Sequence, residues 1–112
     1  MNETDSCIWV QTQVYKRRVF TDSILYCKFV NRRVDIYFYP EGKLEGTFHT
    51  LLDFETELPK YKFCRCNRQY IVNVDYIEQF SEKILEVVLV NGFHVQIAKE
   101  RKEELFKLLG VC

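Results

Sequence analysis

Basic side chains gather in four short segments of a chain whose formal net charge is zero. Arginine can donate two parallel hydrogen bonds to a guanine edge or to a phosphate, and lysine can neutralise a phosphate as a point charge. Acidic residues dominate elsewhere in the sequence. A neutral chain can therefore present one basic face if its fold brings these segments together; otherwise they are scattered, solvated charges. The segments are Lys16-Arg17-Arg18, Lys28 to Arg33, Lys60 to Arg68 and Lys99 to Lys102.

Residue patterns that support catalysis or metal binding are missing from the sequence. His49 and His94 lie on strand-like segments, without a nucleophile elbow or metal-ligand spacing around them. Cys64-x-Cys66 lacks the two-residue gap and the second cluster that zinc sites usually show. On an extended strand the two thiols share a face, so we interpret them as small apolar strand residues. We expect no enzyme activity, no metal and no cofactor.

Length and composition favour one folded domain spanning residues 1–112. Hydrophobic residues make up 47% and aromatic residues 15% of the chain, which excludes a disordered tail. No apolar run approaches the roughly 20 residues that cross a bilayer, and the polar start does not resemble a signal peptide. An odd number of cysteines in such a chain suggests reduced thiols. We therefore predict a cytoplasmic protein that does not contact membranes.

Alternation with period two predicts strands over most of the sequence. Val34 to Tyr39 places Val34, Ile36 and Phe38 on one face, and Asn91-Gly92 is a strong hairpin signal before a strand with inward Val95 and Ile97. The expected strands are Ile8 to Val10, Val14 to Phe20, Ile24 to Phe29, Val34 to Tyr39, Leu44 to Phe48, Phe63 to Arg65, Tyr70 to Asn73, Ile84 to Val90 and His94 to Ile97.

Two segments break this alternation and predict helices. Thr50-Leu-Leu-Asp53 resembles a capping box, so Leu51 to Leu58 can form a short helix that Pro59 ends. Lys99 to Leu109 has the apolar spacing of an amphipathic helix, with Gly110 as a stop signal. The sequence therefore predicts a mainly β fold of antiparallel sheets, with one short internal helix and a C-terminal helix.

The segment Phe63-Cys-Arg-Cys-Asn-Arg-Gln-Tyr-Ile-Val-Asn73 resembles the core motif of the LytTR family, F-x-R-x-H-R-S-x-I-V-N. Asp22-Ser-Ile-Leu-Tyr26 is similar to the family's D-I-L-Y strand, offset by one residue. Thr50 to Pro59 is similar to its S-L-x-x-L-E-x-x-L-P helix, and Asn91 to Lys99 to its closing hairpin. These blocks follow the family order and cover roughly residues 8–109.

The resemblance implies an elongated array of three small antiparallel sheets whose loops enter successive major grooves of double-stranded DNA. It also implies the output domain of a bacterial response regulator, which binds imperfect direct repeats as a dimer. A receiver domain would need about a hundred further residues, so none is present in these 112 residues. Such a chain is either an excised output domain with an upstream receiver or sensor partner, or a stand-alone regulator.

Carried over position by position, the resemblance selects three loops that the composition also marks as basic. We expect Arg68 to read guanine, or else to pair with a nearby carboxylate. Asn67 could read adenine or cap its turn. Arg32 and Arg33 could read bases or hold phosphate. The DNA-binding candidates are Asn31, Arg32, Arg33, Asn67, Arg68, Lys99, Arg101 and Lys102.

Two segments depart from the family pattern, and both departures bear on these roles. Asn67-Arg68-Gln69 stands where the family has H-R-S, and Ala98-Lys99 stands where it has S-R. Lysine cannot make the bidentate contact of arginine, so Lys99, Arg101 and Lys102 are expected to position phosphates. Alanine in place of the serine removes an expected helix N-cap. The alternative to DNA binding is a β-rich module whose tyrosines bind protein or a small ligand.

Overall fold

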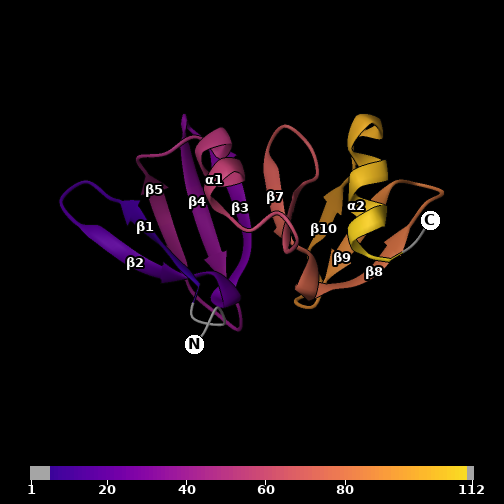
Figure 1. Cartoon of the computed structure of the whole chain (residues 1–112), viewed down its shortest axis with the longest axis horizontal. Coiled ribbons are helices and arrows are strands. Elements are labelled where there is room, and N and C mark those ends of the chain that lie inside the picture. The colour runs from indigo at the N-terminus through magenta and orange to yellow at the C-terminus, as the bar shows by residue number, and fades with distance from the viewer. Residues whose placement is uncertain (1–5, 111–112) are drawn as a thin grey trace.

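The computed structural model describes residues 6–110 as three antiparallel sheets and two helices (Figure 1). The strands and helices run in this order: β1 Cys7–Gln11, β2 Lys16–Phe20, β3 Ile24–Val30, β4 Arg33–Phe38, β5 Lys43–Thr47, α1 Leu51–Glu57, β6 Phe63–Arg65, β7 Tyr70–Asn73, β8 Ile77–Ser81, β9 Glu86–Leu89, β10 His94–Gln96 and α2 Lys102–Leu108. Short 3-10 turns occupy Thr21–Ser23, Val74–Tyr76 and Lys99–Arg101. The expected mainly β class, with its two helices, is confirmed.

A central sheet of five strands in the order β5-β4-β3-β7-β6 separates two apolar cores. One core lies between this sheet, α1 and the β1–β2 sheet, and is centred on Phe54 and Ile36, which are fully buried. The other lies between the opposite face, the β8–β9–β10 sheet and α2, and includes Leu89 and Leu105. Because both faces of the central sheet are covered, its inner strands are apolar on both sides.

Aromatic side chains occupy much of the second core. Tyr26 stacks on Tyr37 with ring centroids 4.5 Å apart and on Phe93 with centroids 4.8 Å apart. Tyr70 meets Tyr26 edge-on at 5.7 Å. Burial and the neighbouring phenols raise the pKa of Tyr26 far above its usual range. These rings therefore pack the sheets together instead of forming an exposed aromatic interface.

The α1 helix begins as the sequence predicts. The Thr50 hydroxyl accepts a hydrogen bond from the Asp53 amide at 3.0 Å, and the Asp53 carboxylate accepts one from the Thr50 amide at 2.9 Å. This reciprocal capping box satisfies two amides that the helix itself leaves without partners. Phe54 and Leu51 then face the sheet and fix α1 across β3, β6 and β7.

The C-terminal sheet differs from expectation in two places. Strand β9 begins only at Glu86, because Leu85 has a φ of 52° and Ile84 is 59% exposed in the turn before it. Strand β8, which pairs with β9, was not expected. Its three central residues, Glu78, Gln79 and Phe80, are exposed, so it lacks the apolar alternation that marks a half-buried strand.

Candidate nucleic-acid interface

Three connections predicted to bind DNA lie along one edge of the molecule. They are the β3–β4 turn, the β6–β7 loop and the junction between β10 and α2 (Figure 1). Strands β3 and β10 run toward this edge, and strands β4 and β7 run away from it. The antiparallel order of the central sheet thus brings together the β3–β4 turn and the β6–β7 loop, which are more than thirty residues apart in sequence.

Hydrogen bonds lock these three connections to one another. The Phe29 amide donates to the Gln69 carbonyl at 2.8 Å, which joins the end of β3 to the β6–β7 loop. The Ala98 amide donates to the Cys66 carbonyl at 2.9 Å, which joins the same loop to the start of the C-terminal helical segment. Since backbone bonds hold them, the three connections form one edge with fixed spacing.

The β3–β4 turn places Arg32 at its tip. Val30 pairs with Arg33, and the two residues between them, Asn31 and Arg32, have φ angles of 51° and 66°. Positive φ at both central positions is the pattern of a type I′ turn, which matches the twist of adjacent strands. Arg32 is exposed, whereas the Arg33 guanidinium lies 3.6 Å from the centroid of the Phe48 ring. Arg33 is thus stacked along the sheet and not extended from the tip.

The Asn67 side chain caps the β6–β7 loop. Its Oδ1 accepts hydrogen bonds from the amides of Gln69, at 2.8 Å, and Tyr70, at 3.1 Å. Its Nδ2 donates to the Gln96 carbonyl at 2.6 Å, which ties the loop to β10. Of the two roles expected for Asn67, the structure shows turn capping, with both ends of the amide engaged inside the protein.

The Arg65 side chain also holds the β6–β7 loop. Its Nε and Nη2 donate to the carbonyls of Asn67 and Arg68, each at 3.2 Å, and its Nη1 pairs with Glu55 at 3.2 Å. Every nitrogen group of this guanidinium therefore has a partner. The loop backbone is braced on both sides, so the side chain at its tip projects from a rigid support.

Arg68 lies at that tip. It is exposed, and within residues 6–110 its guanidinium has no ion pair or hydrogen bond. The alternative role expected for it, pairing with a nearby carboxylate, does not occur among these residues. Arg32, Lys99 and Lys102 are likewise exposed and unpaired in the described part of the chain. Four cationic side chains are therefore available along this edge without breaking an internal contact.

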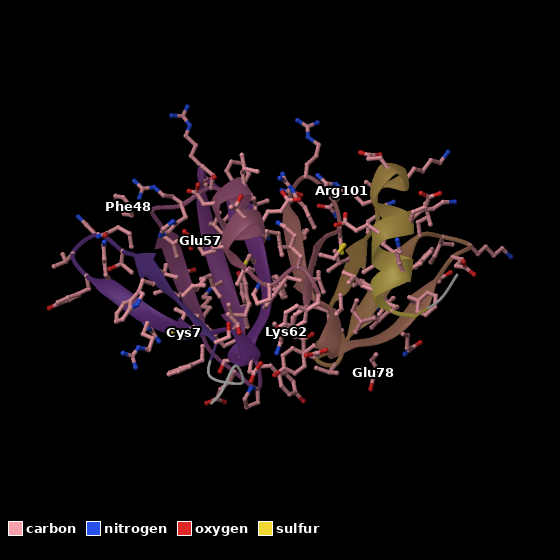
Figure 2. The ribbon with its side chains drawn as sticks, viewed as in Figure 1. Cys7, Phe48, Glu57, Lys62, Glu78 and Arg101 are labelled. Carbon is pink, nitrogen blue, oxygen red and sulfur yellow. The ribbon has the colours of Figure 1, made fainter. Side chains whose placement is uncertain are left out.

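Arg101 differs from its neighbours because it is paired. Its Nη1 lies 3.2 Å from Glu55 Oε2 and 4.0 Å from Glu104 Oε1. Glu55 thus pairs with both Arg101 and Arg65. These two ion pairs link α1 to the central sheet and to the C-terminal segment that carries Arg101 (Figure 2). Sequence reasoning gave no sign of this role, because Glu55 lies in an acidic stretch of equivalent carboxylates. Ala98 provides no side-chain cap for the segment that follows, as expected.

The basic segment Lys16 to Arg18 is on strand β2, away from the three connections (Figure 1). The Arg18 guanidinium lies 5.1 Å from the ring of Trp9 on the neighbouring strand, and Arg17 lies 6.0 Å from the ring of Phe38. These arginines lie over the exposed ring of Trp9 and the half-buried ring of Phe38 in cation–π contact. They do not contribute to the edge that carries Arg32 and Arg68.

The two histidines make contacts inside the protein, and the thiols of Cys64 and Cys66 are buried. His49 Nε2 accepts a hydrogen bond from the Gln11 amide at 2.8 Å, and His94 pairs with Glu86 at 3.1 Å. Burial raises the pKa of the Cys64 thiol to about 12, and that of Cys66 further, so both stay protonated at neutral pH. Among residues 6–110, no group of three or more potential ligands could hold a metal ion. No helix in this range is long and apolar enough to span a bilayer.

A mainly β domain that gathers unpaired basic side chains on loops along one edge has the organisation of a nucleic-acid-binding module. The chain belongs to the LytTr DNA-binding domain family, whose sequence model matches residues 16–110. It is also similar to a solved structure, the LytTr DNA-binding domain of a protein described as a methyl-accepting/DNA response regulator from Bacillus cereus. That match has a TM-score of 0.74 and 26% identity, and it covers 94% of this chain and 97% of the other. No curated protein matches the sequence.

Proposed function

We propose that this chain binds double-stranded DNA in a sequence-specific manner, with the β6–β7 loop and its two neighbouring connections placed in or beside the major groove. The observation that carries the proposal is a set of four cations along one hydrogen-bonded edge, Arg32, Arg68, Lys99 and Lys102, which have no partner among residues 6–110. A chain of zero net charge can bind a polyanion only where its cationic side chains are concentrated on one part of the surface.

Within this proposal the cations divide into two roles. Arg68 reads a guanine edge, because its guanidinium has no partner in the described part of the chain and its loop is braced. Lys99 and Lys102 hold phosphates and fix the register of the domain on the duplex. Asn67 keeps the loop in shape, and Arg33 supports the sheet beside Arg32. Asn31 belongs to the turn that presents Arg32, and Arg101 contacts phosphate only if it leaves Glu55.

The proposal extends to the biological setting that the family and the similar domain suggest. The chain acts in the cytoplasm as a bacterial transcription regulator or as the output domain of a response regulator. It then binds imperfect direct repeats as a dimer and receives its signal from a receiver domain or sensor partner. Two observations support this setting: the similar domain comes from a response regulator, and the four cysteines among residues 6–110 form no disulfide, namely Cys7, Cys27, Cys64 and Cys66.

Selection of preferred sites from random duplex DNA, followed by titration at several salt concentrations, tests the proposal. We expect Arg68→Ala to weaken specific binding by about 1–3 kcal/mol and to relax preference at one base position. Arg18→Ala, which removes an exposed arginine away from the edge, is the matched control and should leave both quantities unchanged. If the two variants have the same affinity and the same base preference, Arg68 is not part of the interface.

Lys99→Ala should instead weaken binding to all sequences to a similar degree and make the salt dependence shallower by about one unit. Lys107→Ala, at the opposite end of α2, is its control. The salt series also separates DNA binding from the alternative of a β-rich protein-interaction or small-ligand module. DNA binding weakens steeply between about 50 and 200 mM salt, whereas an apolar protein interface does not.

A further inference from the structure

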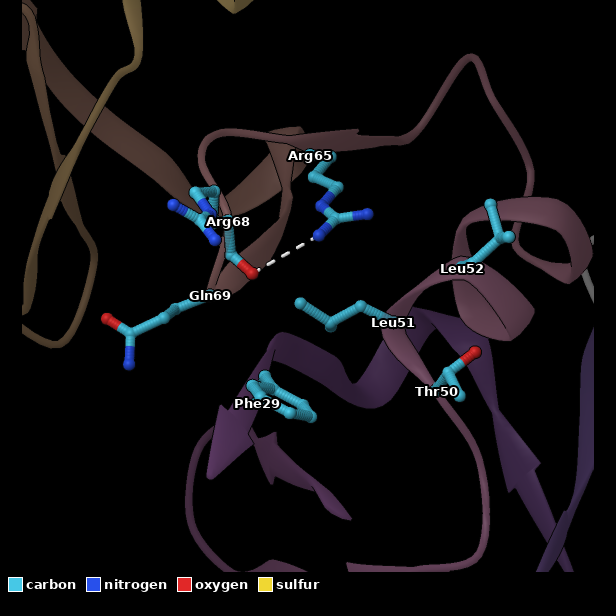
Figure 3. A pocket seen from close by; sticks show the side chains of 7 residues that line it. All are labelled: Phe29, Thr50, Leu51, Leu52, Arg65, Arg68 and Gln69. Carbon is cyan, nitrogen blue, oxygen red and sulfur yellow. Dashed lines mark hydrogen bonds between the residues drawn. The ribbon is translucent and has the colours of Figure 1, made fainter. Parts of the chain in front are cut away.

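A groove of about 650 Å³ opens beside the loop that carries Arg68 (Figure 3). Leu51 is buried at its base, Phe29 and Leu52 form apolar walls, and Arg65, Arg68 and Gln69 line the opposite side. The groove therefore lies between the end of β3, the start of α1 and the β6–β7 loop. It is part of the same edge that presents the unpaired cations.

The walls of this groove are apolar, whereas the rest of the edge presents cationic side chains. Phe29 is 38% exposed and Leu52 is 64% exposed, although Arg68 and Gln69 beside them are polar. The hydrogen bond from the Phe29 amide to the Gln69 carbonyl fixes the ring relative to the loop. An apolar surface of fixed shape thus adjoins the guanidinium that we assign to guanine reading.

The chemistry of DNA bases narrows what this surface can contact. In the major groove each base pair presents hydrogen-bond donors and acceptors, and thymine alone adds an apolar group, its C5 methyl. Phenyl and isobutyl side chains can make no hydrogen bond but can bury a methyl group. Arg65 does not compete for the base, because its nitrogens are already paired with Glu55 and the loop carbonyls.

Resting on the proposed function, we propose that the groove between Phe29 and Leu52 receives the methyl group of a thymine adjacent to the base pair that Arg68 contacts. The domain then reads two neighbouring positions by different means. Arg68 reads one position by hydrogen bonds, and the apolar walls read the next by burial of a methyl group. This assigns specificity to two residues that carry no charge and no hydrogen-bonding side chain.

Replacement of single thymines by deoxyuridine in a selected duplex tests this assignment, because it removes the methyl group alone. The wild-type chain should bind roughly fourfold more weakly when one particular thymine is replaced, the change that burial of one methyl group is worth. Phe29→Ala should bind the thymine and deoxyuridine duplexes equally. Phe80→Ala is the matched control, since Phe80 is 37% exposed on β8, and it should keep the wild-type difference.

The assignment is overturned if no thymine replacement weakens wild-type binding, or if Phe29→Ala still discriminates between the two duplexes. Leu52→Ala provides a second variant, because a side chain that is 64% exposed contributes little to folding. It should reduce the difference between the duplexes, and an undiminished difference counts against the groove. Failure of the proposed function is seen separately, as the absence of any selected duplex or of salt-dependent binding.

Discussion

Asn67 gives the most direct test of how the β6–β7 loop is held. Replacement by alanine removes two hydrogen bonds to the amides of Gln69 and Tyr70 and one to the Gln96 carbonyl. A typical hydrogen bond contributes about 0.5–1.5 kcal/mol net, and water can take over at the more exposed Gln69 amide. We therefore expect Asn67→Ala to lower the free energy of unfolding by about 2 kcal/mol.

The same variant should weaken specific DNA binding, because Arg68 would then project from a loop that must be ordered on binding. Urea unfolding and DNA titration measure the two effects. Asn67→Asp keeps an acceptor oxygen for the two amides and loses only the bond to Gln96, so its stability should lie between wild type and Asn67→Ala. Gln69→Ala, whose side chain makes no hydrogen bond within residues 6–110, should leave stability unchanged.

An unfolding free energy for Asn67→Ala equal to that of the wild type would refute this reasoning. It would mean that the three contacts add nothing beyond what water provides at the same groups. If stability falls but specific binding does not, Arg68 does not depend on the loop for its placement, and the link between loop shape and base reading is wrong.

Glu55→Gln should lower the free energy of unfolding by about 1 kcal/mol, because it weakens two part-exposed ion pairs, with Arg65 and Arg101. It should also steepen the salt dependence of DNA binding by up to about one unit if the released Arg101 reaches a phosphate; Glu57→Gln, on the same helix, is the control for both measurements. Burial raises the pKa of the Cys27 thiol to about 12 from 9.0, so the unfolded chain releases this proton first. The contribution of Cys27 to stability should thus be constant below pH 9 and fall by about 1 kcal/mol per pH unit above it, and urea unfolding of Cys27→Ala at pH 8 and 10 should show a smaller loss than wild type.

The central sheet could be predicted from sequence because its strands carry clear local signals. Val34 and Ile36 alternate with polar positions, and Thr50 with Asp53 forms a complete capping box. Asp35, on the opposite face, is nevertheless buried, and its Oδ1 accepts a hydrogen bond from the Gly46 amide at 2.7 Å. That contact lies at an irregularity in the β4–β5 ladder, which a period of two does not reveal.

The candidate site was predictable only in part. Basic composition and the family motif located the loops of Arg32, Arg68 and Lys99, and the structure places all three on one edge. Whether each side chain is paired inside the protein or free depends on neighbours that are distant in sequence, so it could not be predicted. Glu55 pairs with Arg101 across 46 residues, and Asn67 bonds to a carbonyl 29 residues away. Sequence spacing alone contains no signal for either contact.

The β3–β4 turn has a consequence for efforts to stabilise this protein. A type I′ turn favours asparagine followed by glycine, yet Arg32 occupies the second position with a φ of 66°. Glycine there would relieve a backbone conformation that a side chain adopts reluctantly, but it would also delete a cation from the tip. Selection for heat resistance and selection for DNA affinity should therefore choose different residues at position 32.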